Sequence, residues 1–296
     1  MNNSNKGILD RENALEAVKP FRNSVDLLND LLDYGICLLP RAFEKRWKDM
    51  KAICVIRVQL RQFLAHLDGA AALIATGNCF TSTLQLRSLL EIAVTLEWLL
   101  TSNTDSKVQY LYVANLRQRR RWNNLGIADS PEAAEPCELT RENRIIDAFL
   151  AKPPFAEIDA SFQQGKGRRE HDLPWYEVYG LQSKPKTTIR KICEELGLIR
   201  DYNNIYCVHS QVAHGCDLGE NILVYENSTA SPIRDPDEIP SVVYLAARLS
   251  VRLYRLIVKE YCASEKEHLE QKYLQDWEPR IPKEYEIVYV PVDTSI

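Results

Sequence analysis

Cysteine motifs are missing from this sequence. Its 8 cysteines form no Cys-x-x-Cys pair and show no regular spacing, so we expect neither a disulfide scaffold nor a zinc ribbon. Several lie inside apolar helical patterns, where cysteine behaves as a small buried hydrophobe in a reducing compartment. The cysteines are Cys37, Cys54, Cys79, Cys137, Cys193, Cys207, Cys216 and Cys262.

The sequence also lacks a strong charge of one sign, a secretory signal and a long apolar run. Its net charge of −4 and its pI near 5.8 exclude a protein that coats nucleic acid through bulk charge, and leave only a local basic patch open. Met1–Lys6 is polar, unlike the start of a signal peptide. The apolar stretch Leu84–Leu100 contains an arginine and two glutamates, which a lone membrane span carries only at high cost. We therefore predict a cytoplasmic protein without a membrane partner.

No signature of a common cofactor site is present. The sequence contains no phosphate loop, no dinucleotide-binding fingerprint, no His-Glu-x-x-His and no Gly-x-Ser-x-Gly. His209 and His214 are five residues apart, so they do not share the helix face that a two-histidine metal site needs. We expect no cofactor and no metal.

Helical periodicity is the dominant positive signal. With 296 residues, of which 45% are hydrophobic and 26% charged, the chain is long enough to bury a substantial core. Apolar residues recur at steps of three and four, which predicts an all-α multi-helix bundle over residues 1–296 as a single domain, with long helices in residues 11–125. The predicted long helices are Arg11–Leu39, ending before Pro40, then Phe43–Thr76, Phe80–Leu100 and Asp105–Leu125.

The rest of the chain is less regular. Residues 126–185 are predicted to be a loop-rich insertion that includes a basic loop, Gln163–Pro174. Residues 186–264 return to a helical pattern and are expected to complete the bundle, with helices at Asp201–His214 and Ser241–Cys262. Residues 278–296 form a tail in which Tyr285–Val292 alternates like a short strand.

One polar stripe lies on the otherwise apolar third helix. Arg87, Ser88, Glu91 and Thr95 fall within one narrow arc of a helical wheel. Such a stripe is either a solvent edge with a structural ion pair between Arg87 and Glu91, or an internal polar site. Both interpretations stay open at the level of the sequence.

The helix predicted at Asp201–His214 carries a second polar face. Tyr206, Ser210 and His214 follow one another at steps of four, so they line one side of that helix. His214 would lie in the last turn, where the helix dipole raises the pKa of an imidazole. It is either a proton-transfer group or a histidine that caps the helix.

A run of basic residues is a further candidate. Arg117, Arg119, Arg120 and Arg121 lie on the fourth predicted helix, and the basic loop adds three more cations. They predict either a phosphate-binding surface, with Arg120 and Arg121 contacting substrate, or a solvated helix face. The loop cations are Lys166, Arg168 and Arg169.

Several short strings, taken in order, carry a resemblance to a known family. They are Leu86–Glu91, Trp175, Ile192–Leu198, Tyr202, Tyr206 and Ser210–Gly215. In order and spacing, the chain from about Ile53 to Tyr225 resembles a bacterial helical family of unknown function numbered 5677. That family is regarded as similar to HEPN proteins, helical bundles that include metal-independent ribonucleases of phage-defence and toxin systems.

The resemblance implies a defence- or stress-related dimer that binds or cleaves RNA or binds a nucleotide. If it is an enzyme, it would be a metal-independent endoribonuclease. The resemblance gives Arg87 the role of stabilising phosphate charge, His214 that of an acid or base, and Glu91 that of an orienting partner. Tyr206, Ser210 and Trp175 would support these groups or stack on bases.

Two other interpretations remain. Asn204–Ala213 contains no arginine or lysine, whereas HEPN ribonucleases carry an arginine shortly before the histidine. A noncatalytic binding or regulatory module, in which these residues are structural, needs no such motif. An enzyme acting on a small phosphorylated ligand through Arg87 and His214 is the third interpretation.

Overall fold

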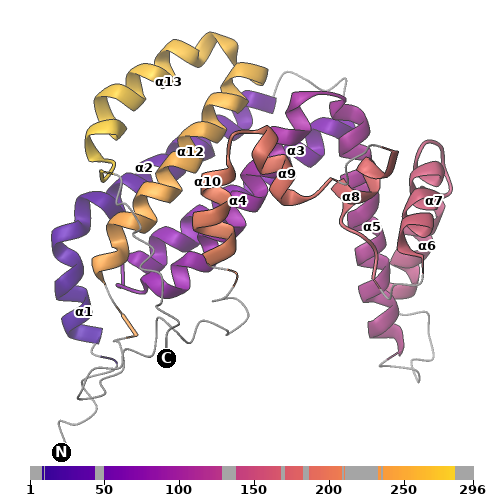
Figure 1. Ribbon diagram of the computed structural model, residues 1–296, viewed down its shortest axis with the longest axis horizontal. Helices are drawn as coiled ribbons and strands as arrows, with labels where there is room; N and C mark the ends of the chain where they lie inside the picture. The colour runs from indigo at the N-terminus through magenta and orange to yellow at the C-terminus, as the bar shows by residue number, and fades with distance from the viewer. Residues whose placement is uncertain are drawn as a thin grey trace, which may run out of the picture. The chain divides into compact units, whose positions relative to one another are not determined.

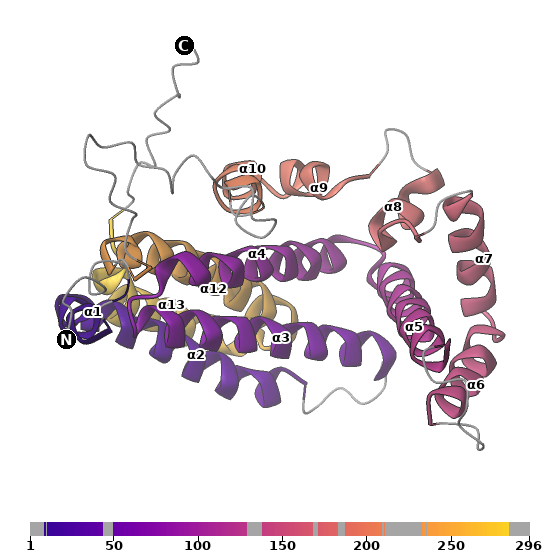
Figure 2. The ribbon, with the colours of Figure 1, turned by 90° about the horizontal axis from the view of Figure 1, so that it is seen from below.

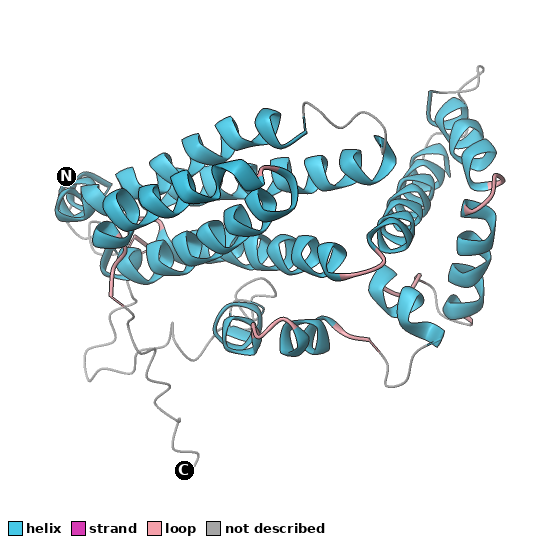
Figure 3. Cartoon of the chain, turned by 90° about the horizontal axis from the view of Figure 1, so that it is seen from above, coloured by secondary structure: helices cyan, strands magenta, loops and turns pink. Residues whose placement is uncertain are grey.

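The computed structural model consists of helices joined by loops (Figures 1 and 3). Among the residues that it describes none forms a strand, which confirms the predicted all-α multi-helix bundle. The strand considered at Tyr285–Val292 lies outside the described residues. The structure describes residues 9, 11–43, 50–128, 138–167, 171–182, 187–208, 210, 233–234 and 236–283.

The chain divides into two compact units. The sequence predicts one helical domain, and the contacts between its helices divide that domain into unit 1 and unit 2. Unit 1 comprises Met1–Lys48, Ile56–Glu97 and Leu196–Ile296. Unit 2 comprises Asp49–Val55 and Trp98–Glu195. Each unit is described below by itself.

Unit 1 is built around α2 and α12, which pack side by side along their lengths (Figures 1 and 2). Both helices bury leucine and valine at helical spacing, which explains why they form and why they face each other. The helices that contribute to unit 1 are α1 (Arg11–Val18), α2 (Arg22–Phe43), α3 (Met50–Ile74), α4 (Cys79–Thr101), α10 (Ile199–Asp201), α12 (Ile239–Tyr261) and α13 (Lys266–Lys272).

The first predicted helix differs from the observed structure in its division and in its end. The expected helix Arg11–Leu39 is divided into α1 and α2, and α2 continues through Pro40 to Phe43. A proline removes one backbone donor, and so close to the end of a helix the loss affects only the last turn. Arg41 stabilises that turn, because its Nε donates a hydrogen bond of 2.9 Å to the carbonyl oxygen of Cys37.

Three helices of unit 1 approach one another closely at Gly35. A Cβ atom at this position would lie 2.5 Å from the hydroxyl of Tyr254 and closer still to Leu64 Cδ2, so only glycine fits. The fully buried hydroxyl of Tyr254 donates a 2.8 Å hydrogen bond to the carbonyl oxygen of Leu31. Burial raises the pKa of Tyr254, so this hydroxyl stays a neutral donor. Glycine and tyrosine together bring α2, α3 and α12 into contact.

Unit 2 contains more helix than the sequence predicts. Three helices lie within the segment 126–185, where a loop-rich insertion is expected, and the last turn of α7 covers the start of the expected basic loop. α7 forms because Phe155, Ile158 and Phe162 recur at helical spacing and are buried. Besides the ends of α3 and α4, the helices of unit 2 are α5 (Thr104–Ala128), α6 (Glu138–Leu150), α7 (Phe155–Lys166), α8 (Trp175–Tyr179) and α9 (Ile189–Glu195).

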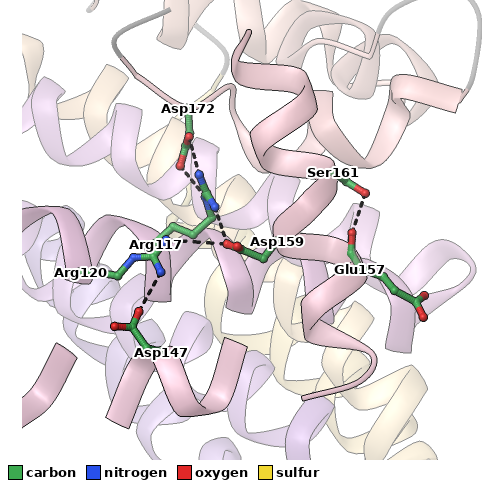
Figure 4. Close-up of polar contacts among 7 residues, drawn as sticks. All are labelled: Arg117, Arg120, Asp147, Glu157, Asp159, Ser161 and Asp172. Atoms are coloured by element: carbon green, nitrogen blue, oxygen red, sulfur yellow. Dashed lines mark hydrogen bonds and ion pairs between the residues drawn. The ribbon is translucent and has the colours of Figure 1, made fainter. Parts of the chain in front are cut away.

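A buried arginine ties the helices of unit 2 together (Figure 4). The side chain of Arg117, on α5, is 5% exposed and pairs with Asp159 of α7 through Nη1. Its Nε and Nη2 bind both carboxylate oxygens of Asp172, at 2.7 and 2.9 Å. Burial by itself raises the pKa of Asp172, but the hydrogen bonds from Arg117 outweigh burial and lower that pKa.

Replacing Gly35 by alanine tests the close approach in unit 1. We expect Gly35→Ala to lower the free energy of unfolding by about 1–3 kcal/mol, because the new methyl group overpacks the contact with Tyr254. The matched control is Gly69→Ala on α3, where a Cβ meets Gln85 at 3.4 Å. The control should gain up to about 1 kcal/mol from helix propensity. Urea unfolding followed by circular dichroism measures both, and equal stability of the two variants would contradict the packing argument.

Arg117→Met tests the buried ion pairs of unit 2. The variant should lose about 3–5 kcal/mol of unfolding free energy at neutral pH, because Asp159 and Asp172 both lose the hydrogen bonds of the buried guanidinium. Arg119→Met, which removes an exposed arginine from the same helix, should leave the unfolding midpoint unchanged.

The pH dependence of the Arg117 pair has a defined sign. The folded pKa of Asp172 lies below its ordinary value of 3.8, so its contribution to stability is present above that pH and is lost as the pH falls below it. The stability difference between wild type and Arg117→Met should therefore narrow in acid. A difference that stays constant between pH 7 and pH 3 in urea unfolding would rule out this pair as the cause.

Candidate functional site

The polar stripe on α4 lies at the side of an otherwise buried helix. Leu86, Leu89 and Leu90 are almost fully buried, which makes α4 a central helix of unit 1. The side chain of Arg87 is 21% exposed and that of Glu91 45% exposed, so the stripe is neither an open surface nor part of the dry core.

Arg87 is held by three side chains. Its Nε donates a 3.0 Å hydrogen bond to Glu91 Oε1, one turn along α4. Its Nη1 donates a 3.2 Å hydrogen bond to the hydroxyl of Ser210, and its Cζ lies 4.6 Å from the centre of the Tyr206 ring. The structure thus brings together four of the residues predicted from the sequence to form a site.

The charge of Arg87 is secured by these contacts. Burial lowers the pKa of its guanidinium, but the hydrogen bond and the charge of Glu91, together with the hydroxyl of Tyr206, outweigh burial and raise that pKa. The guanidinium is therefore a permanent cation in a fixed orientation. Such a group can stabilise an anion but cannot transfer a proton.

The helix opposite Arg87 differs from the predicted one. It begins at Ile199 instead of Asp201 and widens into a π-helix at Tyr202–Cys207, beside α4 (Figures 1 and 2). Within it, the ring of Tyr202 stacks on that of Tyr206 at 4.9 Å and 13°. Apolar periodicity does not reveal a π-helix, and π-helices occur often at functional sites.

Two side chains of this helix mark its buried and its open face. Ile205 is fully buried and fastens the π-helix to unit 1. Cys207 is an exposed free cysteine on the same turn as the stacked tyrosines. The predicted proton-transfer residue, His214, lies outside the described residues, as does His209.

Trp175 has aromatic partners within unit 2. The half-buried indole ring packs against Trp98 with ring centres 5.3 Å apart, and Tyr176 lies at 6.0 Å. It also borders the small core formed by Leu99, Val108 and Leu111. Packing of the bundle therefore already accounts for this tryptophan, and its role in stacking on a base stays a prediction.

The basic run on α5 is an interface between helices. Besides Arg117, two of its members pair with carboxylates. Arg119 Nε lies 2.9 Å from Glu142. Arg120 Nη1 lies 2.9 Å from Asp147, the pair that Figure 4 shows. α6 supplies both acids, so the charges of the run are used to bind α6 and α7 to α5. Three arginines of the expected phosphate-binding surface therefore already have carboxylate partners, and the surface itself stays a prediction.

The remaining arginines of the predicted basic surface are Arg121, Arg168 and Arg169. Arg121 is exposed, and no carboxylate in the described part of the chain pairs with it. Arg168 and Arg169 lie outside the described residues. The acidic residues on α6 and α7 were visible in the sequence, but their register against α5 was not.

Unit 1 contains a second charged cluster, which was not predicted from the sequence. Arg252 on α12 binds both oxygens of Glu97 at 2.7 Å and also donates to the carbonyl oxygen of Leu196 at 2.6 Å. One turn earlier, Arg248 Nη2 donates a 3.1 Å hydrogen bond to Asp201, whose side chain is 2% exposed. The available signal was the pair of arginines, four residues apart, on a strongly apolar helix.

The site offers a cation and hydroxyl groups. No group of three or more His, Cys, Asp or Glu side chains able to hold a metal ion occurs among the residues with described positions. Within the same residues, no helix combines the length and apolar character that a membrane crossing requires.

Comparisons with known proteins place the chain in a family. Residues 58–222 match a family of unknown function, DUF5677. No curated protein and no solved structure matches significantly. Arg87, Glu91, Tyr206 and Ser210 fall within the matched range, whereas Arg248 lies beyond it. Because the match covers more than half of its 296 residues, the chain belongs to the family DUF5677.

Proposed function

We propose that the chain is a HEPN-like bacterial protein that binds RNA at the Arg87 site and cleaves it without a metal. The observation that carries this proposal is the fixed, partly exposed guanidinium of Arg87, held by Glu91 and Ser210 over the ring of Tyr206. The proposal extends the resemblance to HEPN proteins, and it places the protein in the cytoplasm, acting as a dimer in defence or stress.

The donors of Arg87 suit a phosphate. A guanidinium carries five N–H groups, and hydrogen bonds to Glu91 and Ser210 engage its Nε and one of its Nη1 hydrogens. The remaining donors can bind two oxygens of a phosphodiester in the planar geometry that arginine favours. Because Glu91 and the Tyr206 ring already orient the group, little conformational entropy is lost when a phosphate binds.

The proposed chemistry needs one further residue. As the 2′-hydroxyl attacks the neighbouring phosphorus, negative charge grows on the phosphoryl oxygens, and a fixed cation such as Arg87 stabilises it. His214 would take the proton from the hydroxyl or give one to the leaving oxygen. Tyr206 and Ser210 would hold the phosphate against Arg87 or accept hydrogen bonds from the ribose.

A noncatalytic module is the second candidate function. Its supporting observation is that Arg87 and Glu91 form an ion pair with no net charge, and that Ser210 is bonded to the same arginine. Such a network would specify how α4 meets the π-helix, and the surface formed would bind or regulate a partner.

RNA cleavage by the purified protein in the presence of EDTA tests the proposal. Wild type should cleave tRNA or total RNA, and Arg87→Ala should reduce the rate about 10²–10³-fold, as the loss of a charge-stabilising donor does. His214→Ala should reduce it about 10²–10⁴-fold. The matched control is Arg190→Ala, which removes an arginine from another helical pair, with Glu194 four residues on, and should cleave like wild type.

The outcomes separate the two candidate functions. Circular dichroism and melting curves establish that each variant is folded before its rate is compared. If folded wild type neither binds nor cleaves RNA, the proposal is wrong and the noncatalytic module is supported. If Arg190→Ala loses as much activity as Arg87→Ala, the site has been assigned to the wrong residues.

A further inference from the structure

The helical segment opposite Arg87 has few apolar anchors. Among the residues described from Leu198 to Ser210, only Leu198 and Ile205 are buried apolar residues. Asn203 and Cys207 are exposed. Burial of two side chains is a small hydrophobic contribution for a segment of this length. The other apolar side chains described in the segment are at most half-buried, so polar contacts contribute to its position against α4 and α12.

A pair of charged residues fastens the start of this segment to α12. Asp201 is 2% exposed, and its carboxylate accepts a 3.1 Å hydrogen bond from Arg248 Nη2. The Nη1 of the same arginine points to the hydroxyl of Tyr244, one turn earlier on α12, at 3.4 Å. Arg248 therefore has a defined orientation although its side chain is 37% exposed.

A second contact holds the residues just before the segment. Arg252 joins Glu97 of α4 to the carbonyl oxygen of Leu196. Leu196 is followed by Gly197, whose φ of +69° is the left-handed conformation that ends a helix and redirects the chain. The segment thus enters from a fixed turn, and Asp201 sets its rotation.

The rotation of the segment decides whether the site forms. Tyr206, in the π-helix that follows Asp201, and Ser210, four residues further on, both meet Arg87. A rotation about the helix axis would carry both side chains away from the guanidinium. A hydrogen-bonded ion pair at the buried end of the segment opposes such a rotation, which is the specifying role that buried ion pairs play in some proteins.

We propose that Asp201 and Arg248 are positioning residues, which hold the π-helix in the rotation that brings Tyr206 and Ser210 to Arg87. The inference rests on the proposed function, because it names the residues that assemble the RNA site. Neither residue touches the substrate in this scheme. Arg248 holds the carboxylate of Asp201, and Asp201 in turn fixes the rotation of the helix that carries Tyr206 and Ser210.

The electrostatics of Asp201 support a role in geometry over one in stability. Burial raises the pKa of Asp201 more than the neighbouring arginines Arg248, Arg252 and Arg200 lower it. The ionised carboxylate is therefore costly to bury, and a neutral side chain of the same shape should not weaken the fold. Asp201→Asn should accordingly keep the melting temperature of wild type while loosening the segment.

Hydrogen exchange measured by mass spectrometry on the full chain tests the proposal. Asp201→Asn and Arg248→Met should both raise amide exchange in residues 199–208 about tenfold, with no change elsewhere in unit 1. The matched control is Arg255→Met, which removes another arginine of α12, 42% exposed and paired with Glu270 outside the site. Unchanged exchange in residues 199–208, or the same increase in the control, overturns the proposal.

Measuring the affinity for RNA distinguishes a positioning role from a merely structural one. Asp201→Asn should weaken RNA binding about tenfold in wild type but have little effect in an Arg87→Met background, because both changes remove the same contact. Equal weakening in both backgrounds overturns the positioning role. If wild type binds no RNA, the proposed function fails, and the exchange experiment still decides whether Asp201 and Arg248 orient the helix.

Discussion

Arginine side chains on largely apolar helices impose the main constraint on this structure. A guanidinium keeps its charge at physiological pH, so it can be partly or fully buried only where carboxylates or carbonyl oxygens accept its hydrogen bonds. Each such partner belongs to a definite turn of a definite helix, and pairing therefore fixes which helices meet and in what rotation. The pairs are Arg87 with Glu91, Arg117 with Asp159 and Asp172, Arg248 with Asp201, and Arg252 with Glu97.

Local patterns in the sequence were sufficient to predict the long helices and the half of the site that lies on α4. Apolar spacing identified α3, α4, α5 and α12 because a half-buried helix must repeat its apolar face every three to four residues. The same reasoning placed Arg87 and Glu91 on one side of α4, since residues four apart are neighbours on any helix.

Long-range pairing could not be predicted in the same way. The basic run on α5 has the composition of a phosphate-binding surface, and only the register of α6 and α7 shows that Arg117 and Arg120 are already paired. Asp201 has no local feature that marks it as buried. Likewise, a proline usually ends a helix, yet α2 continues through Pro40 for three more residues, where the loss of one backbone donor affects only the last turn.

The region that matches the family does not contain all the helices that fold together in unit 1. Residues 58–222 contain the arginine, the glutamate and the tyrosine of the site, but α2 and α12 lie outside this range. These two helices supply much of the core of unit 1, including Leu31 and Tyr254. The matched region thus depends on flanking sequence for its packing, and studies of the site require the flanking helices.

The π-helix also gives the site an accessible chemical handle. Cys207 presents a free, exposed thiol immediately after Tyr206, the residue over which Arg87 lies. A spin label attached to this sulfur would move with the turn of the π-helix that carries Tyr206. Its spectrum would therefore report how firmly that turn is held, without any knowledge of the natural ligand.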